Sequence, residues 1–196
     1  ALVISIILVF KNKERRQNGN KHKSEKYGKQ AKVKLIGHKL EKYAEESGMY
    51  LYDRRIWVKD PTWNNSQWHS NSYRAVSEFE YLYVFWKPGE TIIDRARLNP
   101  HEWAEWGSRG VWNIRSVRAN KEHEAQFPLE LASRVIRLLT DENETVLDPF
   151  MGNGTTGVAA AMLNRAYLGF DKELKYVDLA KRRLQAIQPP LELALD

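Results

Sequence analysis

Residues 146–157 read VLDPFMGNGTTG: a short apolar run, an acid and a glycine-rich turn. Gly152, Gly154 and Gly157 match the spacing G-x-G-x-x-G. Glycine lets the backbone turn sharply and approach a ligand closely, because it has no Cβ atom. Small residues from Thr155 to Leu163 then predict a helix. The stretch therefore indicates a strand, a ligand-binding turn and a helix in succession.

A second strand and a second acid follow at a spacing that is typical of nucleotide-binding units. The strand predicted over 166–170 ends at Asp171, 19 residues after Gly152. A carboxylate there can accept both ribose hydroxyls of an adenosine ligand. The helix predicted over 176–187 closes the unit, whose strands should be parallel with a right-handed crossover. The alternative to a ligand-binding turn is a plain tight turn. The alternative role for Asp171 is to cap the next helix, but that helix is predicted to begin at Tyr176, which is distant for a cap.

The order of the elements disfavours a dinucleotide ligand. A dinucleotide fold normally begins with this unit, whereas only 25 of the 196 residues follow Asp171. The rest of the sheet is therefore expected before residue 128. The Asp148-Pro149-Phe150 start of the turn suits a ligand with a charged amino-acid end instead of a pyrophosphate. A nicotinamide-dependent oxidoreductase remains the second hypothesis, supported by the glycine spacing.

The chain before the glycine turn alternates strand and helix patterns. Residues 1–10 are almost wholly apolar, which predicts a strand buried on both faces of a parallel sheet. Residues 91–120 are rich in Trp and Arg without a sustained period, so we expect them to be the least core-like part. The other predicted elements are helices over 35–47 (ended by Gly48) and 128–139, and strands over 49–58, 80–86 and 145–147.

Charge and composition narrow the class of protein. A hydrophobic share of 42% and a charged share of 29% exclude collagen, a disordered chain and a membrane bundle. With no cysteines the chain has no Cys-ligated zinc site, and we expect no metal and a reducing, cytoplasmic compartment. Residues 11–42 carry twelve Lys or Arg against three Glu, whereas the whole chain has a net charge of +6. The basic loop 11–34 is either a solvated face or a phosphate-binding loop.

These motifs resemble those of the DNA amino-methyltransferases, which make N6-methyladenine or N4-methylcytosine and serve restriction-modification. Residues 148–156 resemble their motif for S-adenosyl-L-methionine (AdoMet), 123–129 the segment before it, and 165–171 the strand with the ribose-binding acid. Residues 56–59 and 80–87 resemble two strands of the catalytic half. The resemblance implies a three-layer α/β sandwich with a mostly parallel, Rossmann-like sheet. It also implies an AdoMet site formed by Phe127, Pro128, Asp148, Phe150, Gly152, Gly154, Thr155 and Asp171.

The same resemblance divides the chain into three parts. Residues 1–90 would be a partial catalytic half, 91–120 a target-recognition insertion and 121–196 the AdoMet-binding half. Double-stranded DNA is the expected partner, and we expect no association with a membrane. We expect the insertion to contact bases and the basic loop to contact phosphates, through Arg95, Arg97, Arg109, Lys21, Lys23 and Lys26.

One family motif is missing from the sequence. The catalytic tetrapeptide, Asp/Ser/Asn-Pro-Pro-Tyr/Phe/Trp, holds the exocyclic amine and stacks on the flipped base. It is expected before the strand at 1–10, and the nearest match, residues 60–63, has one proline and stands elsewhere. We therefore expect an incomplete or split enzyme, with catalytic residues unknown, that binds AdoMet weakly. Alone it should methylate nothing, or it should methylate DNA only with a second chain that supplies the motif. A DNA-binding module without chemistry is the third hypothesis.

Overall fold

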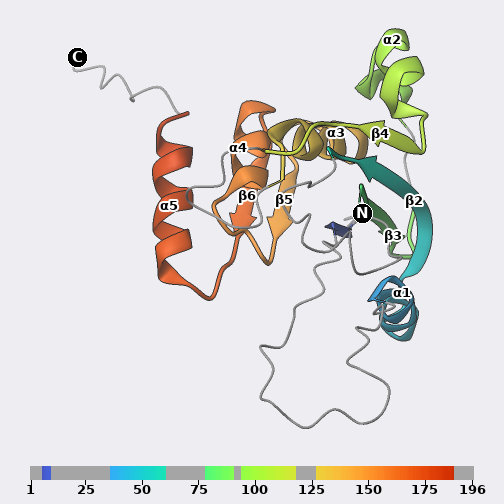
Figure 1. The fold of residues 1–196 in the computed structure, drawn as a ribbon, viewed down its shortest axis with the longest axis horizontal. Coiled ribbons are helices and arrows are strands. Elements are labelled where there is room, and N and C mark those ends of the chain that lie inside the picture. The colour runs from blue at the N-terminus through green and yellow to red at the C-terminus, as the bar shows by residue number, and fades with distance from the viewer. Residues whose placement is uncertain (1–5, 10–35, 61–77, 91–93, 118–126, 188–196) are drawn as a thin grey trace, which may run out of the picture. The chain divides into compact units, whose positions relative to one another are not determined.

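The computed structural model describes residues 6–9, 36–60, 78–90, 94–117 and 127–187 (Figure 1). It is a mixed α/β structure with a four-stranded sheet in the order β1-β3-β2-β4 and a two-stranded sheet of β5 and β6. The chain forms two compact units, Ala1–Arg54 with Glu80–Thr91, and Arg55–Phe79 with Ile92–Asp196. None of the helices within the described ranges is long and apolar enough to cross a membrane. The predicted division at residues 90 and 120 stays a prediction.

The first unit contains β1 (Ile6–Val9), helix α1 (Ile36–Glu46), the beginning of β2 (Tyr50–Val58) and most of β3 (Phe79–Trp86). Strand β3 is central, since Leu82, Tyr83, Val84 and Phe85 are all buried. Helix α1 packs on it through Ala44, which joins a cluster with Tyr83 and Phe85. Gly37 is required here, because a Cβ atom would lie 2.1 Å from the Tyr83 hydroxyl.

The prediction of a parallel partner for the N-terminal strand is wrong. Strand β1 pairs antiparallel with β3, with Ile6 opposite Phe85 and Val9 opposite Leu82. A continuous apolar run reports that both faces of a strand are buried, but it carries no information on the direction of the neighbouring strand. The direction depends on the connection, which the run does not encode.

The second unit contains the predicted strand–turn–helix–strand segment (Figure 1). Strands β5 (Thr145–Asp148) and β6 (Ala166–Gly169) pair in parallel, from Thr145 opposite Ala166 to Asp148 opposite Gly169. Helix α4 (Thr155–Met162) connects them and packs on α3 (Leu129–Leu139) through small side chains, which allow close approach. Helix α5 (Leu174–Gln185) follows β6 and begins two residues earlier than predicted. The parallel unit is confirmed.

Residues 94–117 are more core-like than predicted, and that prediction is wrong for the described part. They form the short helices η2 (Arg95–Arg97), α2 (Pro100–Glu102) and η3 (Trp103–Gly107), and strand β4 (Val111–Asn113). Strand β4 pairs in parallel with β2, and Trp112 is 1% exposed. The Trp112 indole donates to the carbonyl of Trp106 (2.8 Å), and that of Trp57 donates to Ile114 (2.7 Å). In a succession of short helices the buried tryptophans do not recur at a regular spacing along the sequence. The hydrophobic periodicity therefore gave no sign of this core.

Candidate cofactor site at the glycine turn

The glycine turn is bonded to the ends of both strands of its sheet. The Phe150 amide donates to Asp148 Oδ1 (3.0 Å), and the Phe170 amide donates to the Asp148 carbonyl (2.9 Å). The Met151 amide in turn donates a hydrogen bond to the Phe170 carbonyl (2.9 Å). The turn therefore starts from a fixed frame at the carboxyl edge of β5 and β6, where α/β proteins bind ligands.

Two glycines of the motif are needed for conformational reasons. Gly152 and Gly154 have φ angles of +51° and +79°, in the left-handed region that side chains disfavour. Gly154 also marks a close approach, because a Cβ atom there would lie 2.7 Å from the Cβ of Ala180 in α5. Gly154 is the N-cap of α4 and offers no side-chain cap. The first turn of α4 thus presents backbone N–H groups at this edge.

Asp171 lies against the turn, as the sequence predicted. Its Oδ2 accepts a hydrogen bond from the Gly152 amide (3.1 Å), and its Oδ1 accepts one from the Glu173 amide (2.8 Å). Glu173 is the N-cap of α5, so Asp171 also orders the approach to that helix. Distance from Tyr176 is therefore no argument against a capping role, since α5 begins at Leu174. One carboxylate serves both the turn and the helix.

The remaining predicted cofactor residues differ in exposure. Phe150 is 81% exposed at the turn, whereas Thr155 is 3% exposed at the start of α4. Pro128 is buried as the N-cap of α3. Phe127 packs on the cluster of α3 and α4 that contains Ala159. The structure thus brings Asp148, the turn and Asp171 together, and places Phe127 and Pro128 in the packing of α3.

Sequence reasoning missed Tyr167, a half-buried residue of β6 beside the turn. Its hydroxyl is buried and has no hydrogen-bond partner among the described residues. Cβ atoms at Gly157 or Gly169 would lie 2.5 Å from its ring or hydroxyl. Burial, and then the charge of Asp148, raises the pKa of Tyr167, so the phenol is neutral at physiological pH. The signal in the sequence that could have identified Tyr167 was a tyrosine at an inward-facing position of a predicted strand.

The three arginines predicted to contact DNA have different surroundings. Arg97 forms a bidentate ion pair with Asp141, with both N···O distances at 2.7 Å, and this arginine holds the pKa of Asp141 below its usual range. Arg95 is exposed in η2. Arg109 is exposed, and its Nε donates to the Ala104 carbonyl (2.9 Å). Lys21, Lys23 and Lys26 lie outside the described residues. The predicted DNA contact of Arg97 stays a prediction, and its guanidinium is already paired with Asp141.

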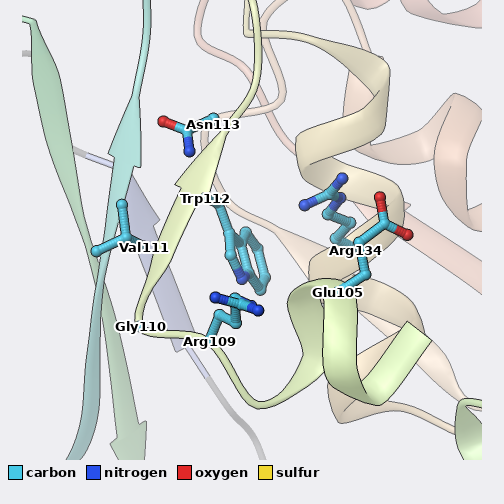
Figure 2. Close-up of a pocket in the computed structure, with 7 residues that line it drawn as sticks. All are labelled: Glu105, Arg109, Gly110, Val111, Trp112, Asn113 and Arg134. Atoms are coloured by element: carbon cyan, nitrogen blue, oxygen red, sulfur yellow. The ribbon is translucent and has the colours of Figure 1, made fainter. Parts of the chain in front are cut away.

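Arg109 lines a pocket of about 590 Å³ on β4 and the segment before it (Figure 2). The pocket also contains Glu105, Asn113 and Arg134. The Arg134 guanidinium lies 5.9 Å from the centroid of the Trp112 ring, which Arg55 approaches at 5.1 Å. These cation–π contacts hold the buried tryptophan and leave a pocket rim with both donors and acceptors. Among the described residues no cluster of His, Asp and Glu could hold a metal ion.

A family comparison identifies the chain. Residues 5–182 match the N6_N4_Mtase family model, described as DNA methylase. The chain belongs to this DNA methylase family. The predicted resemblance is therefore confirmed, and with it the Rossmann-like methyltransferase type of fold.

Individual relatives of the chain agree with the family match. M.BglI, a type II methyltransferase of Bacillus subtilis, is 61% identical over 172 residues, which are 88% of this chain and 49% of that protein. The chain thus spans about half the length of M.BglI. A Thermus thermophilus protein complexed with S-adenosyl-L-methionine is similar with a TM-score of 0.65 and 27% identity, over 96% of this chain and 68% of that one. The M1.HpyAVI–SAM complex is similar with a TM-score of 0.60 and 28% identity, over 76% and 69%.

Proposed function

We propose that this DNA methylase transfers a methyl group from AdoMet to the exocyclic amine of adenine or cytosine in double-stranded DNA. The observation that carries the proposal is the position of Asp171, whose carboxylate lies at the end of β6 and 3.1 Å from the Gly152 amide. Membership of the family supports the reaction class. The similarity to two structures that hold AdoMet supports the cofactor.

The chemical groups of the turn fit AdoMet. Asp148 and Asp171 supply two carboxylates at the ends of adjacent parallel strands. AdoMet carries a cationic sulfonium, an ammonium group and two ribose hydroxyls, all of which a carboxylate can stabilise. Its single carboxylate suits the N-terminus of α4, where the backbone N–H groups have no side-chain cap. A pyrophosphate would place two negative charges beside Asp148 at the start of the turn, so this acid disfavours NAD.

Each part of the turn has a proposed role. Asp171 binds the ribose hydroxyls, and the backbone from Gly152 to Thr155 lies along the cofactor. The exposed ring of Phe150 contacts the adenosine part, and Phe127 and Pro128 contribute to the same pocket. When bound, AdoMet supplies an electrophilic methyl group on its sulfonium. The protein's task is to orient that methyl group toward the amine and to exclude water.

A melting experiment separates the proposed function from its alternatives. AdoMet or S-adenosylhomocysteine at 100 times its Kd should stabilise the folded chain by about 2.7 kcal/mol, because it binds the folded state alone. For a chain of this size that corresponds to a rise in melting temperature of roughly 5–10 °C. NAD at the same concentration should cause no shift. A rise with NAD instead would support the oxidoreductase. A rise with duplex DNA but with neither AdoMet nor NAD would support a DNA-binding module.

We propose that residues 11–34 and 91–120 each contact the DNA. The first segment carries a local excess of Lys and Arg. In the second, Arg95 is exposed, and Arg109 stands at a pocket that also offers the side chains of Asn113 and Glu105. Arg, Asn and Glu side chains are the groups that read base edges, whereas lysines mainly contact phosphates. The second segment would therefore contribute sequence preference, and the first would contribute affinity.

The salt dependence of DNA binding tests the basic loop. Replacing Lys21, Lys23 and Lys26 by Ala should weaken binding and flatten the slope of log K against log salt by about one for each phosphate that is no longer neutralised. Fluorescence anisotropy with a labelled duplex at several salt concentrations measures this slope. A variant with the same loss of charge on exposed residues of the second unit provides the control: Lys172, Lys175 and Lys181, each changed to Ala. Equal slopes for the wild-type chain and the loop variant would remove the loop from the interface.

Two finer features of the enzyme remain proposals. The first is the finer fold class, a three-layer sandwich with a mostly parallel sheet of the methyltransferase type, which the similarity to solved methyltransferase structures supports. The second is that the amine-holding tetrapeptide is supplied from outside these 196 residues, either by the same polypeptide or by a second chain. The single Pro-Pro pair of the sequence, Pro189-Pro190, follows Gln188 and precedes Leu191, so it does not match the motif.

A further inference from the structure

Helix α5 contacts the glycine turn through an arginine that no motif of the sequence marks. The Nη1 atom of Arg183 donates to the Asn153 carbonyl at 2.7 Å and lies 3.4 Å from Thr155 Oγ1. The side chains of Asn153 and Thr155 are almost fully buried, and the Thr155 hydroxyl also donates to Asn153 Oδ1 (3.0 Å). A charged donor from a distant helix therefore bonds to the middle of the turn.

The acceptor of this bond is placed where it controls the shape of the turn. Asn153 stands between Gly152 and Gly154, the two residues with positive φ angles. Its carbonyl belongs to the same peptide group as the Gly154 amide, which donates to the Met151 carbonyl (2.8 Å). The Arg183 bond and the Met151 bond thus fix the two ends of one peptide plane. Glycines alone would leave that plane free to adopt several orientations, because glycine is permissive.

A second contact of α5 supports the same conclusion. Ala180 precedes Arg183 by three residues, so both lie on one face of the helix. Ala180 is 2% exposed, and a Cβ atom at Gly154 would lie 2.7 Å from its Cβ. Helix α5 thus covers the turn with a small side chain at one point and holds it with a guanidinium at another. Arg183 itself is half-buried, which strengthens a charged hydrogen bond relative to one in water.

We propose that Arg183 is a positioning residue for AdoMet binding, which acts through the Asn153 carbonyl without touching the cofactor. It keeps the turn in the conformation that receives the ligand, so the binding free energy is not spent on ordering the loop. This inference rests on the proposed function, because it assigns a role toward the same cofactor. Arg182, the neighbour of Arg183 in the sequence, is exposed and has the same charge, which makes it a matched control.

The test compares four chains of 196 residues: wild type, Arg183→Ala, Arg183→Lys and Arg182→Ala. Calorimetric titration with AdoMet should show a Kd about tenfold higher for Arg183→Ala, the equivalent of one charged hydrogen bond. The lysine variant should recover part of that loss, because an ammonium can donate to one carbonyl. Arg182→Ala should bind as the wild type does.

Melting temperatures without ligand separate positioning from plain stability. If Arg183→Ala melts earlier but its folded form binds AdoMet with the wild-type Kd, the arginine is a structural residue and the inference is wrong. If Arg183→Ala does not fold, Arg183→Met decides in its place, because methionine keeps an apolar stem of similar length but has no hydrogen-bond donor. A Kd equal to that of the wild type in this variant overturns the inference. A wild-type chain that does not bind AdoMet at all would instead refute the proposed function.

Discussion

The 196-residue chain, incubated alone with tritiated AdoMet and mixed-sequence duplex DNA, is expected to incorporate no label above background. Methylation of an amine requires its nitrogen to be held in line with the methyl group. Proximity and orientation of this kind account for about 7–11 kcal/mol of a barrier in favourable cases. The groups that would hold the amine belong to a tetrapeptide that the 196 residues do not contain. The expected effect is therefore a complete loss of measurable transfer.

M.BglI, which is 61% identical over the shared residues, is the positive control in the same assay. Robust incorporation by the 196-residue chain would show that another group holds the amine. Asp60 would then be the first residue to replace, because it begins the nearest match to the motif, Asp60-Pro61-Thr62-Trp63. Its Oδ2 atom is buried at the end of β2 without a hydrogen-bond partner among the described residues.

Replacement of Asp171 by Ala should raise the Kd for AdoMet by about 10- to 100-fold, because the carboxylate is proposed to accept the ribose hydroxyls and a charge-assisted hydrogen bond contributes roughly 1.5–3 kcal/mol. The same variant loses the bonds from the Gly152 and Glu173 amides, so the turn would also be less ordered. Both effects act in the same direction on affinity, and calorimetric titration measures their sum.

Asp171→Asn and Asp178→Ala separate these contributions. The asparagine keeps one oxygen that can accept a backbone amide, but it lacks the charge that favours the ribose hydroxyls. Asp178 is an exposed acid of α5, so its loss changes the net charge equally without altering the turn. We expect weak binding for Asp171→Asn and wild-type binding for Asp178→Ala. An unchanged affinity in both Asp171 variants would remove this residue from the cofactor site.

The segment from β5 to β6 could be predicted because its signals are local. The glycines, the two acids and the helix of small residues all lie within one continuous strand–turn–helix–strand unit. Their spacing alone brings Asp171 to the turn, and the structure places its carboxylate 3.1 Å from the Gly152 amide. The start of α5 was misplaced by two residues, because Leu174 is exposed and does not belong to the inward apolar face from which the helix was predicted.

Features that depend on distant partners could not be predicted from one sequence. The antiparallel pairing of β1 with β3 joins residues more than 70 positions apart. The ion pair of Arg97 joins it to Asp141, 44 residues away. Arg183 reaches Asn153 across 30 residues. Nothing in the local pattern distinguishes such an arginine from an exposed one like Arg182.

Glycine-selective NMR provides the most direct test of the central claim, that AdoMet binds at the turn between β5 and α4. The chain has 11 glycines, so ¹⁵N-glycine labelling gives a small set of signals. Addition of AdoMet should shift the amide signals of Gly152 and Gly154 and leave those of Gly107 and Gly110, near the Arg109 pocket, in place. Shifts confined to Gly107 and Gly110, or shifts at the turn with NAD but not with AdoMet, would contradict the claim.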